Sequence, residues 1–138
     1  MPIRKNAKVE LIRSVPLFSS CSKRELGEIA SMADELDFPA GKTLIKEGES
    51  GREFFVLIEG TVEVKRKGRK LPALGRADCI GEIALVLDVP RTATVTTTSP
   101  VRALVLTNQS FRSLLEGSPQ IQLKVIQSLA ERLAPEII

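Results

Sequence analysis

The chain has 138 residues, 43% of them hydrophobic and 27% charged, with a net charge of +3. This length suits one domain with its own core, and the composition is that of a globular protein rather than a disordered or fibrous one. There is no histidine, so the commonest general base and metal ligand is missing, which disfavours enzyme and metal-site functions. We therefore expect a protein that is not an enzyme and binds no metal.

Membrane insertion and disulfide bonding are disfavoured as well. The longest apolar stretches, such as Phe54–Ile58, are far shorter than the roughly 20 residues needed to cross a bilayer. No apolar targeting segment follows Met1. The two cysteines, Cys21 and Cys79, have no spacing that indicates a disulfide framework or a zinc site. We expect a cytoplasmic setting, at most on the cytoplasmic face of a membrane protein, with no membrane contact by this domain.

The first third of the chain has helical patterns. Ser22-Lys23-Arg24-Glu25 has the form of a capping box. The apolar residues that follow have the spacing of an amphipathic helix: Leu26, Ile29, Ala30 and Ala33. Upstream, Val9 and Ile12 lie one helical turn apart, and Pro16-Leu17-Phe18 forms a connecting turn. Helices are predicted over about residues 5–34.

Short β-rich runs separated by glycines occupy the middle of the chain, from about residue 35 to about residue 107. In one of them the alternation places Val62 and Val64 on a buried face, with Gly60 as the turn before it. Many short strands at close spacing predict a jelly-roll barrel. The runs are Thr43–Lys46, Phe54–Glu59, Thr61–Lys65, Ala93–Thr97 and Val101–Leu106.

Two further helices are predicted over about residues 108–133. The first ends at Gly117, a natural C-terminal cap, and Ser118 and Pro119 begin the second. The second helix has more apolar surface than one face needs, so part of it is expected to meet a partner, a lid or a second subunit. Its two apolar rows are Ile121/Val125/Leu129 and Leu123/Ile126/Ala130/Leu133.

The predicted fold is therefore mainly β with flanking helices (α+β). It is a jelly-roll barrel with N-terminal helices, one short helix between strands and two C-terminal helices, all in a single domain over residues 1–138.

The segment from Gly81 to Val95 carries the most chemical information. A short helical turn after Gly81 offers unpaired N–H groups, so Ile83 and Ala84 can donate to an anion. Arg91 can return a guanidinium to the same place.

A carboxylate beside a bound phosphate would repel it, so Glu82 must meet another part of the ligand. A sugar hydroxyl can donate to it. The residues alone leave an alternative open, in which Glu82 and Arg91 form a surface ion pair.

This run closely resembles the phosphate-binding cassette of the cyclic nucleotide-binding domain family. The family pattern is Gly-Glu-x-Ala-Leu, a short variable stretch, and Arg-(Ser/Thr/Ala)-Ala-(Thr/Ser)-Val, and this chain fills every fixed position. The stretches 39–49 and 55–64 also look like the family's strands and glycine turns, and the resemblance covers about residues 8–133.

The resemblance implies roles for named residues. Glu82 would bind the ribose 2′-hydroxyl and Arg91 the cyclic phosphate, while Thr92 and the amides near Ile83 and Ala84, after Gly81, would complete the phosphate site. The base would contact apolar barrel residues, for which the candidates are Val62, Leu74 and Ile80, and Arg132 would reach over the base from the last helix, which closes the pocket.

The implied ligand is cyclic AMP or cyclic GMP, and we favour cyclic AMP, although Thr92 is compatible with either. The implied function is ligand-gated regulation, in which the C-terminal helix moves on binding. The partner would be a linked effector domain of a channel, a transporter or a transcription regulator, with a slight preference for the first two, and the parent protein could be a homo-oligomer.

Three alternatives remain. A docking domain could keep the fold without binding a ligand. Such a domain usually has Glu82 or Arg91 of the cassette replaced, and this chain has both residues. A nucleic-acid binder could use the basic run of Lys65, Arg66, Lys67, Arg69 and Lys70, which lacks aromatic partners and is better interpreted as a solvated hairpin tip without direct nucleic-acid contact. A redox or gas sensor would need about four cysteines or a histidine.

Overall fold

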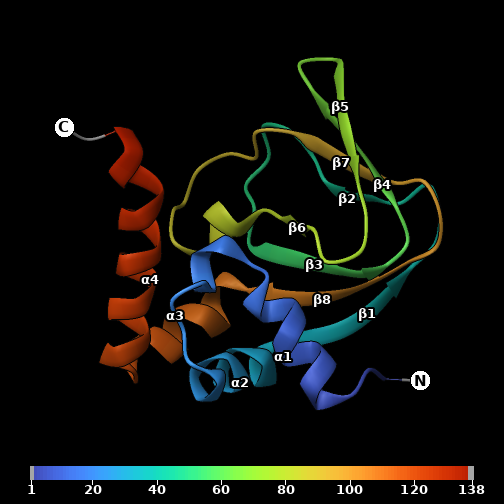
Figure 1. The fold of residues 1–138 in the computed structure, drawn as a ribbon. Helices are drawn as coiled ribbons and strands as arrows, with labels where there is room; N and C mark the ends of the chain where they lie inside the picture. The colour runs from blue at the N-terminus through green and yellow to red at the C-terminus, as the bar shows by residue number, and fades with distance from the viewer. Residues whose placement is uncertain (1, 137–138) are drawn as a thin grey trace.

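Helices α1 to α4 gather on one side of the block of strands (Figure 1). The computed structural model describes residues 2–136, apart from the side chains of Arg132 and Glu136. The helical elements are α1 (Lys5–Arg13), η1 (Pro16–Phe18), α2 (Lys23–Met32), η2 (Glu82–Leu85), α3 (Asn108–Glu116), α4 (Pro119–Leu133) and η3 (Ala134–Glu136). The strands are β1 (Asp34–Phe38), β2 (Thr43–Ile45), β3 (Glu53–Glu59), β4 (Val62–Arg66), β5 (Arg69–Leu74), β6 (Cys79–Ile80), β7 (Thr94–Thr97) and β8 (Val101–Thr107).

The strands form two antiparallel sheets of four, in the orders β1-β8-β3-β6 and β2-β7-β4-β5. The predicted jelly-roll class with flanking helices is confirmed. Sequence patterns did not identify β1, β5 and β6 as strands. Strand β1 is charged and half exposed, β6 has only two residues, and β5 contains Pro72, which is tolerated because β5 lies at a sheet edge.

Strand β3 divides two hydrophobic clusters. Phe54, Val56 and Ile58 pack with the helices, whereas Phe55 and Leu57 point between the two sheets. Because side chains alternate along a strand, this continuous apolar run serves a strand that is covered on both faces. Strand β3 therefore links the helical layer to the sheet that carries β7.

Local signals place the N-terminal helices. The predicted capping box is present, since Ser22 Oγ accepts from the Glu25 amide at 3.2 Å and the Glu25 carboxylate accepts from the Ser22 amide at 2.7 Å. One detail is corrected, because α2 ends at Met32 and Ala33 is already extended. The chain turns there directly into β1.

The C-terminal helices begin and end where the sequence indicates. Ser118 Oγ accepts from the Ile121 amide at 3.3 Å, as an N-cap does. Gly117 is the C-cap of α3, but its φ of −91° is right-handed rather than left-handed. The predicted capping position is confirmed, and the cap needs no left-handed conformation.

Helix α4 packs through only one of its two apolar rows. Ile121 and Val125 are buried against the helical cluster, and α4 lies on η1. On the other row, Leu123, Ile126 and Leu133 are 54%, 60% and 54% exposed. Over the described residues, none of the helices combines the length and apolar character that a bilayer crossing requires.

Candidate functional site

The cassette joins β6 to β7 through η2 and an extended segment. Gly81 caps η2 at φ +80°, a left-handed conformation that favours glycine. The chain returns to the sheet through an isolated bridge between Pro90 and Ser50. Strand β7 begins at Thr94, so Arg91 lies three residues before the strand.

The side chain of Arg91 lies in a space left by two glycines. A Cβ atom on Gly51 would overlap the guanidinium group, and a Cβ atom on Gly81 would overlap Nη1. Nη2 donates a hydrogen bond to the main-chain oxygen of Glu53 at 2.6 Å. The arginine is thus fixed by the backbone of the β2–β3 turn and of β3, rather than extended into solvent.

The main chain of Arg91 is also held. Its amide donates to the Glu49 oxygen at 2.9 Å, and its carbonyl accepts from the Gly48 amide at 2.9 Å. These bonds tie the cassette to a turn more than forty residues earlier in the chain. Both ends of the arginine therefore have a defined position before any ligand arrives.

A pocket of about 250 Å³ opens beside Arg91. This volume lies just below the roughly 300–1,000 Å³ of typical small-molecule pockets, so it suits a sugar-phosphate better than a whole nucleotide. Glu82 is one of the lining residues, and its Oε2 atom is shielded from solvent. The lining residues are Cys79, Gly81, Glu82, Ile83, Ala84, Val89, Pro90, Arg91 and Thr92.

The partial burial of Arg91 favours binding of an anion at its guanidinium group. Desolvation lowers the pKa of its guanidinium, and the charge of Glu53 acts in the opposite direction. The pKa of an arginine is far above neutral, so the group stays charged. A cation that has lost part of its hydration gains more from a bound anion than a fully hydrated one. Among the described residues, no group of three or more His, Cys, Asp or Glu could hold a metal ion.

The amides at the start of η2 differ in part from the expectation. The Ala84 amide already donates to the Gly81 oxygen at 3.1 Å. A short 3₁₀ turn closes its hydrogen bonds one residue earlier than an α-helix would. The Ala84 amide can therefore contact an anion only if it shares or exchanges this bond.

A comparison with family models identifies the protein family of this chain. The family model described as "Cyclic nucleotide-binding domain" matches residues 35–118. The chain belongs to the cyclic nucleotide-binding domain family. The matched residues include both sheets except for the first residue of β1, the whole cassette and helix α3.

Named relatives of this family member are regulators. One is a CRP-like cAMP-activated global transcriptional regulator of Mycobacterium tuberculosis, 30% identical over 90% of this chain and 58% of its own length. Another is a cAMP-dependent protein kinase regulatory subunit of Emericella nidulans, 38% identical over 75% of this chain and 26% of its own length. The chain thus spans only part of each relative.

A solved structure gives the same fold. The N-terminal domain of a transcriptional regulator from Streptomyces coelicolor A3(2) superimposes with a TM-score of 0.83 at 30% identity, covering 91% of this chain and 94% of that one. The two-sheet arrangement with its flanking helices is thus shared with a domain of known structure.

The structure brings together six of the predicted site residues of this cyclic nucleotide-binding domain. Gly81, Glu82, Ile83, Ala84, Arg91 and Thr92 all line the pocket. The base-contact candidates lie elsewhere: Val62 and Ile80 are buried between the sheets, and Leu74, opposite Val62 in the ladder, is half-buried. The side chain of Arg132 lies outside the described residues.

Helix α4 does not line this pocket over the described part of the chain. It borders a separate apolar groove of about 460 Å³ together with α3 and Val86, the residue that follows η2. The helix therefore adjoins the far side of the cassette, rather than covering its mouth.

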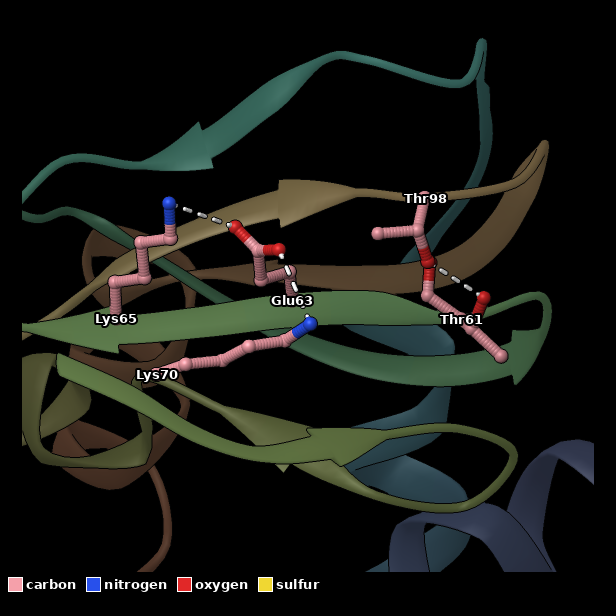
Figure 2. A network of polar contacts seen from close by, with 5 residues as sticks. All are labelled: Thr61, Glu63, Lys65, Lys70 and Thr98. Atoms are coloured by element: carbon pink, nitrogen blue, oxygen red, sulfur yellow. Dashed lines mark hydrogen bonds and ion pairs between the residues drawn. The ribbon is translucent and has the colours of Figure 1, made fainter.

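Most of the basic side chains of the hairpin have hydrogen-bond or ion-pair partners within the domain. Figure 2 shows Glu63 between Lys65 and Lys70, with Nζ–Oε distances of 3.4 and 3.7 Å. Arg66 Nε donates to the Thr92 oxygen at 3.1 Å. Three of the five predicted cations thus have partners inside the domain, which supports a solvated hairpin tip over a nucleic-acid surface.

Sequence reasoning missed the residues that position Arg91. Gly51 and the carbonyl of Glu53 come from about forty positions upstream. Only the density of glycines at positions 48 and 51 pointed to that turn. A glycine or a main-chain carbonyl does not by itself predict a long-range contact.

Proposed function

We propose that this chain is a cyclic AMP sensor domain that regulates a linked effector and carries no catalytic activity. The observation that supports this most is the position of Arg91, fixed between two glycines at the edge of a pocket that Glu82 also lines. One cation for a phosphate and one carboxylate for a hydroxyl match the two ends of a ribose cyclic phosphate.

The proposed roles follow this chemistry. Arg91 binds the equatorial oxygens of the cyclic phosphate through charge-assisted bonds, and the Thr92 hydroxyl and the amides near Ile83 and Ala84 add donors. Glu82 accepts from the ribose 2′-hydroxyl. The pocket takes the sugar-phosphate, and the base extends toward the barrel, where Leu74 has more exposed surface than Val62 or Ile80.

Cyclic AMP is proposed over cyclic GMP because relatives from two protein classes are named as cAMP-activated or cAMP-dependent. The same names support a regulatory role and leave the effector class open between a transcription regulator and a kinase. We also propose a single domain over residues 1–138 in a cytoplasmic setting, where Cys21 and Cys79 are thiols.

The proposed switch runs from the cassette to α4. The turn η2 packs against α3, and Val86 shares an apolar groove with Leu115 and Ile126. A ligand that shifts η2 alters this groove, and it can bias α4 only through contacts that differ between the two states. Because the chain has no tryptophan, an Ile126→Trp variant reports on the groove alone, and its emission is expected to shift on adding cyclic AMP.

The test is calorimetric titration of the domain with cyclic AMP and cyclic GMP, with wild type and Arg91→Ala side by side. We expect wild type to bind cyclic AMP more tightly and Arg91→Ala to lose about 100-fold or more in affinity, because two charge-assisted bonds are removed.

A second arm isolates Glu82. Glu82→Gln is expected to weaken cyclic AMP binding by about tenfold and to have little further effect on the 2′-deoxy analogue, which lacks the hydroxyl. No heat from a folded wild-type domain with either nucleotide would contradict the sensor and favour a ligand-free docking domain.

A further inference from the structure

The β4–β5 hairpin ends beside the start of β7. Strand β4 pairs with β7 as far as Lys65, which lies opposite Thr94. The next residue, Arg66, is therefore placed where the β7 chain leaves the sheet. Beyond it, Lys67 and Gly68 both have positive φ, 51° and 76°, as in a tight two-residue hairpin turn. The turn fixes the position of Arg66.

Arg66 extends the contact between the two chains past the end of their ladder. Its Nε donates to the main-chain oxygen of Thr92 at 3.1 Å, across 26 positions of sequence. Thr92 directly follows Arg91. A side chain of the hairpin thus supplies a hydrogen bond where main-chain pairing has stopped.

The Arg91–Thr92 segment is a thin wall between two hollows. Both residues line the pocket of about 250 Å³ that faces η2, and both line a second one of about 460 Å³ that faces the hairpin. The second hollow is also bordered by Glu47, Gly48 and Arg66. Because the segment borders a hollow on each side, the hydrogen bonds of its main chain contribute strongly to where it lies.

The β2–β3 turn supplies the other support. Gly48 and Glu49 bond to the main chain of Arg91. The Glu47 carboxylate in turn accepts from the Lys67 amide at 3.0 Å. The Glu47 amide also donates to Thr94 Oγ1 at 3.0 Å. The hairpin tip, this turn and the wall are therefore one hydrogen-bonded unit, in which the turn bonds to Arg91 and Thr94 and Arg66 bonds to the Thr92 carbonyl between them.

We propose that Arg66 is a positioning residue for the phosphate site: by holding the Thr92 carbonyl it keeps the Arg91 guanidinium aligned with the pocket. This inference rests on the proposed function, since it names a further residue of the same site. Arg66 acts through the main chain of Thr92. Arginine suits this role because its Nε–H lies within a planar, rigid group, whereas lysine carries its donors at the end of a flexible stem.

The experiment compares four proteins: wild type, Arg66→Ala, Arg66→Lys and Arg69→Ala. Arg69 pairs with Arg66 across the hairpin, so its removal deletes the same charge from the same tip. Cyclic AMP affinity is expected to fall about three- to tenfold in Arg66→Ala and nearly as much in Arg66→Lys. Arg69→Ala should remain within about twofold of wild type.

A ligand-free measurement accompanies the titration. Hydrogen exchange at the Gly48 and Arg91 amides, whose bonds join the β2–β3 turn to the wall, is expected to accelerate in both Arg66 variants and not in Arg69→Ala. This arm tests the support of the segment even if wild type binds no cyclic nucleotide, so failure of the proposed function is seen separately.

Two results would overturn the proposal. Equal losses in Arg66→Ala and Arg69→Ala, with Arg66→Lys like wild type, would mean that only the positive field of the hairpin matters. Unchanged affinity and unchanged exchange in Arg66→Ala would mean that the turn alone positions the segment.

Discussion

The β4–β5 hairpin and the cassette are both cationic, but they differ in how their charges are held. The hairpin has five lysines and arginines within six positions, yet two of them pair with Glu63 and a third bonds to a carbonyl. The cassette has one arginine, half-buried between two glycines and next to a pocket. A cation that is desolvated and fixed makes the cassette the better candidate for an anion site, although the hairpin has more charges.

The largest effect is expected from filling the space that holds Arg91, which tests whether its fixed position matters for binding. Gly51→Ala introduces a methyl group that overlaps the guanidinium, and the resulting displacement is expected to cost about 100-fold in cyclic AMP affinity by calorimetry. The control is Gly27→Ala, where a Cβ meets nothing within 4 Å. Wild-type affinity in Gly51→Ala would show that the position of Arg91 is not what matters.

The second prediction separates backbone strain from steric overlap. Gly81 and Gly41 have nearly equal φ, 80° and 82°, but only a Cβ at Gly81 would overlap Arg91. In urea unfolding, Gly41→Ala is expected to lose about 1 kcal/mol of stability. Gly81→Ala should lose about 1–3 kcal/mol more. Equal losses would mean that the arginine moves aside freely.

The third prediction locates the ligand with the two cysteines. Cys79 lines the pocket, whereas Cys21 is buried and its pKa is raised to about 11 by desolvation and by the charge of Glu25, partly offset by Lys124. At about pH 8 the Cys21 thiol therefore stays protonated and unreactive toward iodoacetamide.

Mass spectrometry should show alkylation at Cys79, slowed about tenfold by cyclic AMP at ten times its Kd. Cys21 is the internal control. Undiminished labelling of Cys79 under saturating ligand would place the nucleotide elsewhere.

The smallest effect is expected from freeing the hairpin charges. Glu63→Gln releases Lys65 and Lys70 and should strengthen binding to heparin by about two- to fivefold, the value of weak surface pairs. Cyclic AMP affinity should not change. Glu116→Gln removes the same charge from an exposed position on α3 and serves as the control. An equal gain in both variants would show that net charge, and not release of these lysines, is responsible.

Features that depend on near neighbours could be predicted from the sequence. The capping box at Ser22, the turn at Gly60 with φ +97°, and the N-cap at Ser118 all involve residues within a few positions of one another. Strands β1 and β6 could not be identified, because a charged strand and a two-residue strand have no usable alternation. Their pairing is decided by β8 and β3.

In the candidate site, too, the residues close in sequence could be predicted and the distant ones could not. The cassette residues could be named because they lie in one contiguous stretch that resembles a family pattern. Gly51, the Glu53 carbonyl and Arg66 reach that stretch from 26 to about 40 positions away, and a carbonyl or a glycine gives no sign of such a contact. The exposed row of α4 was expected from its two apolar rows, but its place beside Val86 required the tertiary fold.

The burial of both faces of strand β3 affects how the domain unfolds. Its odd and even side chains belong to different hydrophobic clusters, so the helices cannot detach without exposing one face of a strand whose other face still holds the second sheet. Neither cluster can be lost alone at low cost. The helical layer and the jelly roll should therefore unfold in one cooperative transition, and heat or denaturant should produce coincident curves for helix and strand signals.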